Sequence, residues 1–136
     1  MSNVGKIIGN VPLLVAPFGI YNFVAFTSED YKATFTSGAA DFLSISNLIV
    51  FVGLILLFIE IYKATRTGQS SIIDHIFSML LFVGALVEFI LVEQAQTTTF
   101  LTVLMIMLVD VVGGFTITIR GARRDFGAGG GGIPMG

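Results

Sequence analysis

Charged residues are confined to a few short stretches of this chain, and four apolar runs lie between them. Each run has roughly 20 residues, the length that an α-helix needs to cross about 30 Å of hydrocarbon. The runs cover residues 7–26, 42–62, 72–92 and 99–119. Only 12% of the residues are charged, far below the roughly 25% of soluble domains. The sequence therefore predicts an all-α membrane protein, in which residues 1–126 form a bundle of four transmembrane helices.

The basic residues support this number of helices and also predict an orientation. Lysine and arginine accumulate in the cytoplasmic loops of membrane proteins. One side of the predicted bundle carries Lys6, Lys63, Arg66, Arg120, Arg123 and Arg124, whereas the other side carries only Lys32. We therefore expect both termini in the cytoplasm.

A cleaved signal peptide is the alternative interpretation of the first run. The apolar region of a signal peptide has about 7 to 15 residues, which is shorter than this run. The run also contains Pro12 and Pro17 and leads to no small-x-small cleavage site. A retained helix is the preferred interpretation.

The connections and the tail have different expected structures. The loop from residue 27 to 41 carries four charges and is expected to be a solvated connector, with binding of a partner as the alternative. Ser71 is predicted to cap the third helix, with Asp74 near the positive end of the helix dipole. The short connection over 93–98 predicts that the third and fourth helices are antiparallel neighbours. The glycine-rich tail, 127–136, is expected to be disordered without a partner.

Of the acids inside the apolar runs, where a charge is costly and is retained for a partner or a task, three matter most. They are Asp110, Glu88 and Glu60. Asp110 is the deepest, about 13 Å from the cytoplasmic end of its helix at 1.5 Å per residue. No lysine or arginine lies at its level, so we expect it to be neutral, bonded to hydroxyl groups, or paired with a cation of another chain. Its helix carries a small, polar face: Thr99, Thr102, Ile106, Asp110, Gly113 and Gly114.

Depth along the helices groups the remaining polar residues. Glu88 lies near the non-cytoplasmic end, at a level similar to that of Tyr21, Asn22, Ser46 and Asn47. These side chains are predicted to be able to line an outward-facing polar pocket.

A second group lies near the cytoplasmic ends of the helices. His75, Glu60 and Asp74 belong to it, and a His75–Glu60 ion pair or contact with water and headgroups is expected. The last helix is followed by Arg120, Arg123 and Arg124. These arginines are expected at the level of anionic lipid headgroups, as a topological anchor or as a specific lipid site.

Several classes of function lack support in the sequence. The chain has no cysteine and one histidine, so thiolate, bis-histidine haem and multi-histidine metal sites are not expected in one copy. No phosphate-binding loop, dinucleotide fingerprint, zinc-protease motif or serine nucleophile elbow is present. We therefore expect no cofactor, no enzymatic activity and no binding of nucleic acid.

In length and topology alone, the chain resembles the small multidrug-resistance exporters. That family relies on a membrane-embedded glutamate in its first helix, whereas residues 7–26 contain no acid here. The resemblance therefore identifies no functional residue, and membership is not inferred.

Two hypotheses about function follow. The first is an accessory or structural subunit of a larger membrane complex, which contacts lipids and either other membrane subunits or its own copies. The second is a small oligomeric transporter or channel that uses Asp110, with Glu88, as a proton or cation site. A bacterial inner membrane is the expected location, because bacterial outer membranes are spanned by β-barrels.

Overall fold

The computed structural model describes residues 11–35, 41–65 and 69–132. This part of the chain is helical and contains no strand. Its elements are α2 (Val15–Thr27), α3 (Tyr31–Thr34), α4 (Ile45–Ala64), α5 (Gln69–Leu91), the short 3₁₀ helix η1 (Glu93–Ala95) and α6 (Thr98–Gly132).

Three of the described helices are long and apolar enough to cross a membrane. Their spans are Ile45–Ala64, Ile72–Leu91 and Thr98–Gly121. The helix α2 is apolar but has only 13 residues, or about 20 Å at 1.5 Å per residue. The helical, membrane-type fold predicted from the sequence is therefore present, and its three long helices are those of an integral membrane protein.

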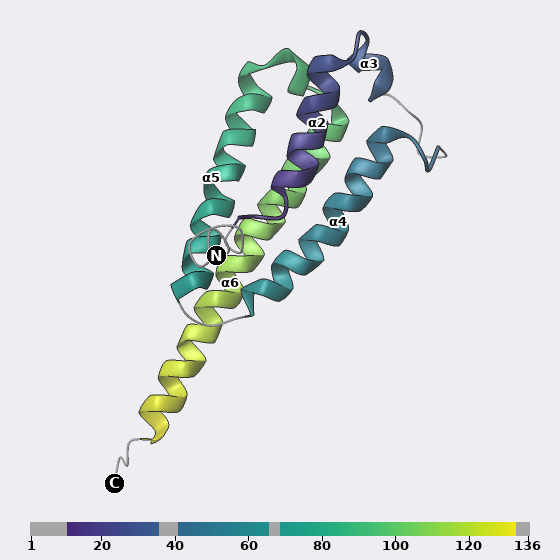
Figure 1. Cartoon of the computed structure of the whole chain (residues 1–136). Coiled ribbons are helices and arrows are strands. Elements are labelled where there is room, and N and C mark those ends of the chain that lie inside the picture. Colours follow the sequence, from purple (N-terminus) through teal and green to yellow (C-terminus); the bar gives the residue numbers. More distant parts are fainter. Residues whose placement is uncertain (1–10, 36–40, 66–68, 133–136) are drawn as a thin grey trace, which may run out of the picture.

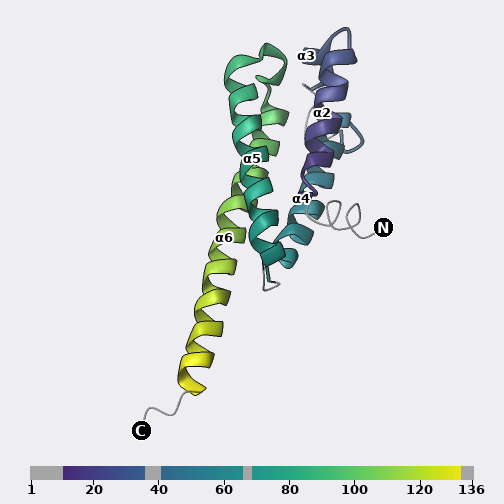
Figure 2. The same ribbon diagram turned by 60° about the vertical axis from the view of Figure 1, so that its left-hand side comes forward.

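The helix α6 is the central element of the bundle (Figures 1 and 2). Both α4 and α5 pack along it, whereas α4 and α5 contact each other only sparsely. Helix α5 runs antiparallel to α6, as predicted from their short connection, and α2 packs mainly on α4. Below, "η1 end" denotes the end of the bundle at η1, and "Lys63 end" denotes the opposite end, where α4 stops.

Two prolines explain where α2 begins. The predicted run starts at residue 7, but residues up to 10 lie outside the described part and Val11 to Leu14 form a turn. In this turn the carbonyl of Pro12 accepts a hydrogen bond from the Val15 amide. Pro17 lies in the first turn of α2, where the missing amide hydrogen costs no helical bond. The prolines therefore favour a helix that starts eight residues later than the apolar run.

The boundaries of the next two helices also differ from the prediction. Ser44 caps α4, because its hydroxyl accepts a hydrogen bond from the Asn47 amide, and α4 therefore begins three residues after the apolar run does. Helix α5 begins at Gln69. The predicted cap at Ser71 is wrong, because Ser71 lies within the helix.

The helix α6 is much longer than its apolar run. Its first turn is capped by Thr97, whose hydroxyl accepts a hydrogen bond from the Phe100 amide. It continues to Gly132, past the predicted end at residue 119, so the part of the glycine-rich tail up to 132 is helical rather than irregular. No proline interrupts this stretch, although each of its glycines costs about 1 kcal/mol relative to alanine in a helix. Figure 1 shows its last turns extending beyond the other helices.

An aromatic cluster holds the η1 end together. The ring of Tyr21 stacks on that of Phe35, with centroids 4.3 Å apart, and meets Phe100 edge-on at 5.0 Å. Phe89 of α5 stacks on the other side of Phe100. Tyr21 and Phe100 are fully buried. The cluster thus joins α2, α5 and α6 by apolar burial, a contribution of about 1.5 to 3 kcal/mol for each large side chain.

Candidate functional site

A group of ionisable side chains is buried at the Lys63 end of the bundle. The Lys63 ammonium donates to Glu60 Oε1 at 3.2 Å and to Asp74 Oδ1 at 3.3 Å. Glu60 is 2% exposed and Asp74 is 5% exposed. The lysine comes from the last turn of α4 and bridges to α5. We call Glu60, Lys63 and Asp74 the ion triad.

The ion triad also holds the start of α2. Glu60 Oε1 accepts a hydrogen bond from the Leu13 amide at 2.8 Å. The first amides of a helix have no partner within the helix and carry partial positive charge, so a carboxylate beside them is stabilising. Glu60 therefore links α4 to the turn that precedes α2.

Asp110 lies beside the ion triad rather than apart from it. The sequence placed it deeper than the other acids, but Glu60, Asp74 and Lys63 are all within electrostatic range of its carboxyl group. Asp110 is 3% exposed. It faces Ser78 of α5, whose buried hydroxyl meets no partner at full hydrogen-bond geometry. The contact between Ser78 and Asp110 is thus a long or bent one.

His75 has a different partner from the one predicted. The structure pairs Glu60 with Lys63, and it places Nε2 of His75 at 2.6 Å from the Thr118 hydroxyl. The imidazole also lies against the ring of Phe115. His75 is buried, as are Glu60 and Asp74, so none of the three reaches water or headgroups freely. The predicted His75–Glu60 ion pair is therefore wrong.

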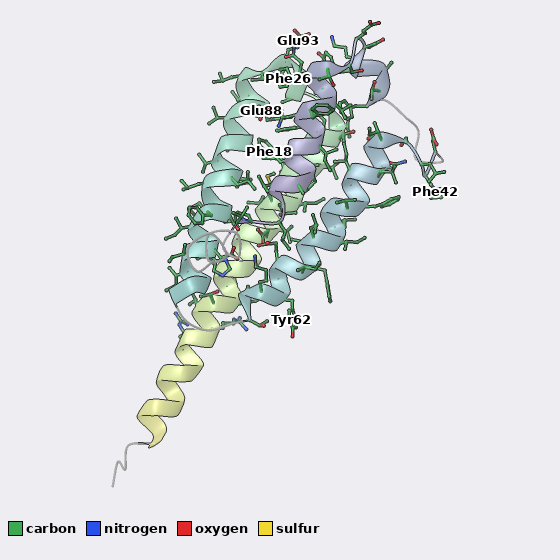
Figure 3. The ribbon with its side chains drawn as sticks, in the orientation of Figure 1. Phe18, Phe26, Phe42, Tyr62, Glu88 and Glu93 are labelled. Atoms are coloured by element: carbon green, nitrogen blue, oxygen red, sulfur yellow. The ribbon has the colours of Figure 1, made fainter. Side chains whose placement is uncertain are left out.

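At the η1 end, two of the predicted pocket residues bridge helices. The Tyr21 hydroxyl is 2.6 Å from both the Gln94 carbonyl, to which it donates, and the Thr97 hydroxyl. Asn22 donates to Glu88 Oε2 at 3.4 Å. Figure 3 shows Glu88 on α5, on the side near α2. The structure thus brings Asn22 to Glu88, and it joins Tyr21 to the connection before α6.

The other two residues of the predicted pocket have separate partners. The hydroxyl of Ser46 bonds to that of Thr99 and so joins α4 to α6. The side-chain amide of Asn47 donates through Nδ2 to the Asp41 carbonyl at 2.7 Å, just before α4. Each of the four predicted side chains thus has its own partner, and the bonds of Tyr21, Asn22 and Ser46 join different elements.

The exposed charges lie at the ends of the helices. Arg120 and Arg123 are exposed on α6, and the side chain of Arg124 lies outside the described part. At the η1 end, Lys32 forms an exposed ion pair with Glu93 at 3.3 Å. The hydrogen bond to the Glu93 carboxylate raises the pKa of Lys32. Figure 3 also shows Phe42 and Tyr62 projecting away from the bundle at the two ends of α4.

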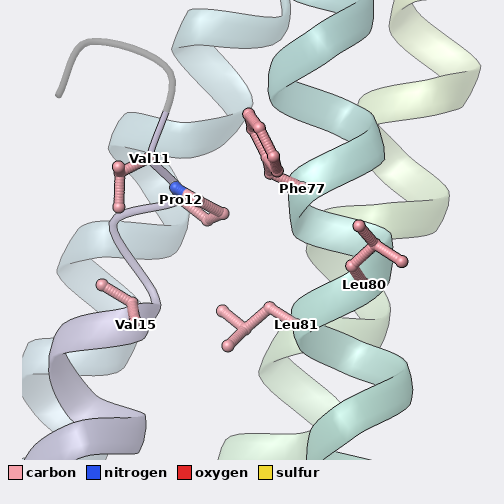
Figure 4. A pocket seen from close by; sticks show the side chains of 6 residues that line it. All are labelled: Val11, Pro12, Val15, Phe77, Leu80 and Leu81. Atoms are coloured by element: carbon pink, nitrogen blue, oxygen red, sulfur yellow. The ribbon is translucent and has the colours of Figure 1, made fainter. Parts of the chain in front are cut away.

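An apolar groove separates α2 from α5 (Figure 4). It has a volume of about 450 Å³. Its lining is Val11, Pro12, Val15, Phe77, Leu80 and Leu81. Few contacts join α2 to α5 directly, and the Asn22–Glu88 hydrogen bond crosses between them nearer the η1 end. The groove is thus a feature of the lateral surface, at the level of the membrane-spanning part of α5.

The sequence alone did not predict the partners of the acids, and it did not predict the groove. Lys63 was interpreted only as a topological charge, although it lies three residues after Glu60, the spacing at which helical side chains meet. Nothing in the sequence indicated that Ser78 meets Asp110. The groove depends on where α2 begins, which the run of apolar residues did not reveal.

No family model matches the chain, and no curated protein or solved structure is similar to it. The function is therefore argued from the geometry described above.

Proposed function

We propose that this chain is a non-enzymatic structural or accessory subunit of a larger integral membrane complex, located in a bacterial inner membrane. In this proposal α2 and the turn before it form the fourth membrane-crossing segment, and both termini lie in the cytoplasm. The groove between α2 and α5 receives a transmembrane helix of another subunit. The apolar groove is the observation that carries the proposal.

The lining of the groove suits a helix from a neighbouring protein. All six lining residues are apolar, and Leu80 is 60% exposed in the chain alone. Association of helices inside a membrane depends on packing, because lipid tails are as apolar as leucine side chains. A groove with walls on two helices offers more packing contacts than one convex helix face.

Two glycines extend this surface toward the η1 end. Gly19 follows Val15 by one turn of α2, and Gly84 follows Leu80 by one turn of α5. A Cβ atom built at either glycine meets nothing within 4 Å. Small residues let the backbones of transmembrane helices approach closely. Neither glycine has such a neighbour in the described chain, which supports a neighbour from another subunit.

Photo-crosslinking in native membranes tests this proposal. A photoreactive amino acid replaces Leu80 in a tagged chain, and the matched control replaces Phe58, which is 74% exposed on α4 and lies outside the groove. After irradiation, we expect the Leu80 probe to give one discrete adduct with another membrane protein, identified by mass spectrometry. The Phe58 probe should give none.

A filling substitution sharpens the same experiment. Gly84→Leu should abolish the adduct because the new side chain occupies the helix contact, whereas Gly121→Leu should leave it. At both glycines an added Cβ atom meets nothing within 4 Å in the described chain, so the two changes are matched in the space at their first side-chain atom. An adduct with a second copy of the chain would indicate a self-associating scaffold rather than a subunit of a larger complex. Adducts with lipid alone would contradict the proposed docking.

Proton- or cation-coupled transport is the second candidate function. The observation that favours it is the position of Asp110 beside the ion triad, where a proton or cation could be exchanged among several carboxylates. In proteoliposomes with an imposed pH gradient, the wild type should dissipate the gradient faster than empty vesicles. Asp110→Asn should stop this flux, and the exposed control Glu93→Gln should not. A wild type no faster than empty vesicles would reject transport of protons.

A further inference from the structure

The interior at the Lys63 end contains more acidic than basic side chains. Glu60, Asp74 and Asp110 are carboxylic acids, and Lys63 is the cation within range of all three. Full ionisation would leave an excess of two negative charges in a region where each acid is at least nine-tenths buried. Such an excess inside a membrane bundle is strongly unfavourable.

The hydrogen bonds show which acid lacks a positively charged partner. Glu60 accepts hydrogen bonds from the Lys63 ammonium and the Leu13 amide, and Asp74 accepts one from the same ammonium. Within the described residues, no ion pair reaches Asp110. Its neighbour Ser78 is 3% exposed, and the Ser78 hydroxyl has no satisfied partner. One buried acid without a cation and one buried hydroxyl without a well-aligned partner thus face each other.

The groups around Asp110 limit which ion can bind between Asp110 and Ser78. Helix α4 presents Glu60 and Lys63, and α5 presents Asp74 and Ser78. His75 lies near the ion triad, but its Nε2 is engaged with Thr118. Across the described ranges, no three acidic or histidine side chains converge as ligands for a metal ion. A proton needs only one oxygen atom and a neighbouring acceptor.

We propose that Asp110 and Ser78 form a buried proton-binding site, in which Asp110 is held as the neutral carboxylic acid and shares a hydrogen bond with the Ser78 hydroxyl. A protonated carboxyl group both donates and accepts, and a hydroxyl does the same, so the two side chains can bond to each other without a buried charge on Asp110. It also removes one of the two excess negative charges. This site goes beyond both functions proposed above, because neither assembly nor transport requires a proton to be held here in the resting protein.

Infrared spectroscopy of the full chain in lipid vesicles at neutral pH tests the site. The wild type should show the carbonyl band of a protonated carboxylic acid, and Asp110→Asn should remove it. The matched control Asp41→Asn changes an exposed aspartate and should leave the band in place. Absence of the band from the wild type, or its persistence in folded Asp110→Asn, would overturn the proposal.

Two further measurements cover the case in which Asp110→Asn does not fold. In the wild type, ¹³C labelling of the aspartate side chains should shift the whole band, and an unshifted band would assign the proton to a glutamate and overturn the site. Ser78→Ala removes a hydroxyl that has no other partner. It should retain the band at a changed frequency because the shared hydrogen bond is lost, and an unchanged frequency would contradict the role of Ser78.

Discussion

The imidazole of His75 occupies the space that a side chain at position 114 would need. A Cβ atom built on Gly114 would lie 2.7 Å from Cε1 and 2.9 Å from Nδ1 of the ring. Gly114→Ala should therefore displace the ring from Thr118 and lower the free energy of unfolding by about 1 to 3 kcal/mol, a typical cost of overpacking. Thermal and denaturant unfolding in detergent, followed by circular dichroism, measures the loss.

The neighbouring glycine provides the control for this substitution. A Cβ at Gly113 meets nothing within 4 Å, so Gly113→Ala should be neutral or stabilising by up to about 1 kcal/mol through helix propensity. In a His75→Ala background, Gly114→Ala should lose most of its cost. Equal destabilisation by the two glycine substitutions would contradict the steric role of Gly114.

Tyr21 is the second residue for which the structure predicts a specific loss of stability. It joins α2 to the Gln94 carbonyl and the Thr97 hydroxyl, and the residue is fully buried. Tyr21→Phe keeps the aromatic stack but leaves these groups without their partner, so it should cost about 1 to 3 kcal/mol in the free energy of unfolding. Tyr62 is 70% exposed, and Tyr62→Phe should change stability little in the same assay. A Tyr21→Phe protein as stable as Tyr62→Phe would argue against the bridge.

At the scale of elements, the ion triad is the polar link between α4 and α5, which otherwise touch only sparsely. Lys63→Met removes the cation and leaves two buried carboxylates, a change that typically costs about 3 to 5 kcal/mol. Lys32→Met breaks the exposed ion pair with Glu93 and should have a minor effect. Comparison of the two unfolding midpoints measures the difference, and similar midpoints would show that the triad does not hold the helices together.

The elements differ in how far the sequence alone could predict them. The long helices α4 and α5 follow from uninterrupted apolar runs, and the buried faces of these helices include Gly53 and Ser78. The start of α2 could not be predicted from the same signal, because Pro12 and Pro17 shape a turn inside an apolar run. The environment of Asp110 was missed for another reason. Depth counted along separate helices does not show how α4, α5 and α6 are offset when they pack.

For the whole molecule, the proposed orientation makes a prediction that the absence of cysteine makes easy to check. Single cysteines are introduced as Glu93→Cys, at the η1 end, and Arg120→Cys, on α6 beyond the Lys63 end. In sealed right-side-out membranes, a membrane-impermeant maleimide should label only the first, because the two positions lie on opposite sides. After permeabilisation it should label both. Labelling of both positions in sealed membranes, or only of Arg120→Cys, would contradict the orientation.

The bridge from Tyr21 to Gln94 also concerns how the chain is made. Its two partners are 73 residues apart, so α2 leaves the ribosome long before the connection that holds it exists. The Glu60 carboxylate that receives the Leu13 amide is 47 residues away and arrives in the meantime. During synthesis α2 therefore gains these contacts in two stages, first at the turn before it and then at Tyr21. A chain that stops before η1 lacks the Gln94 carbonyl and the Thr97 hydroxyl, so its Tyr21 hydroxyl is left without these two partners.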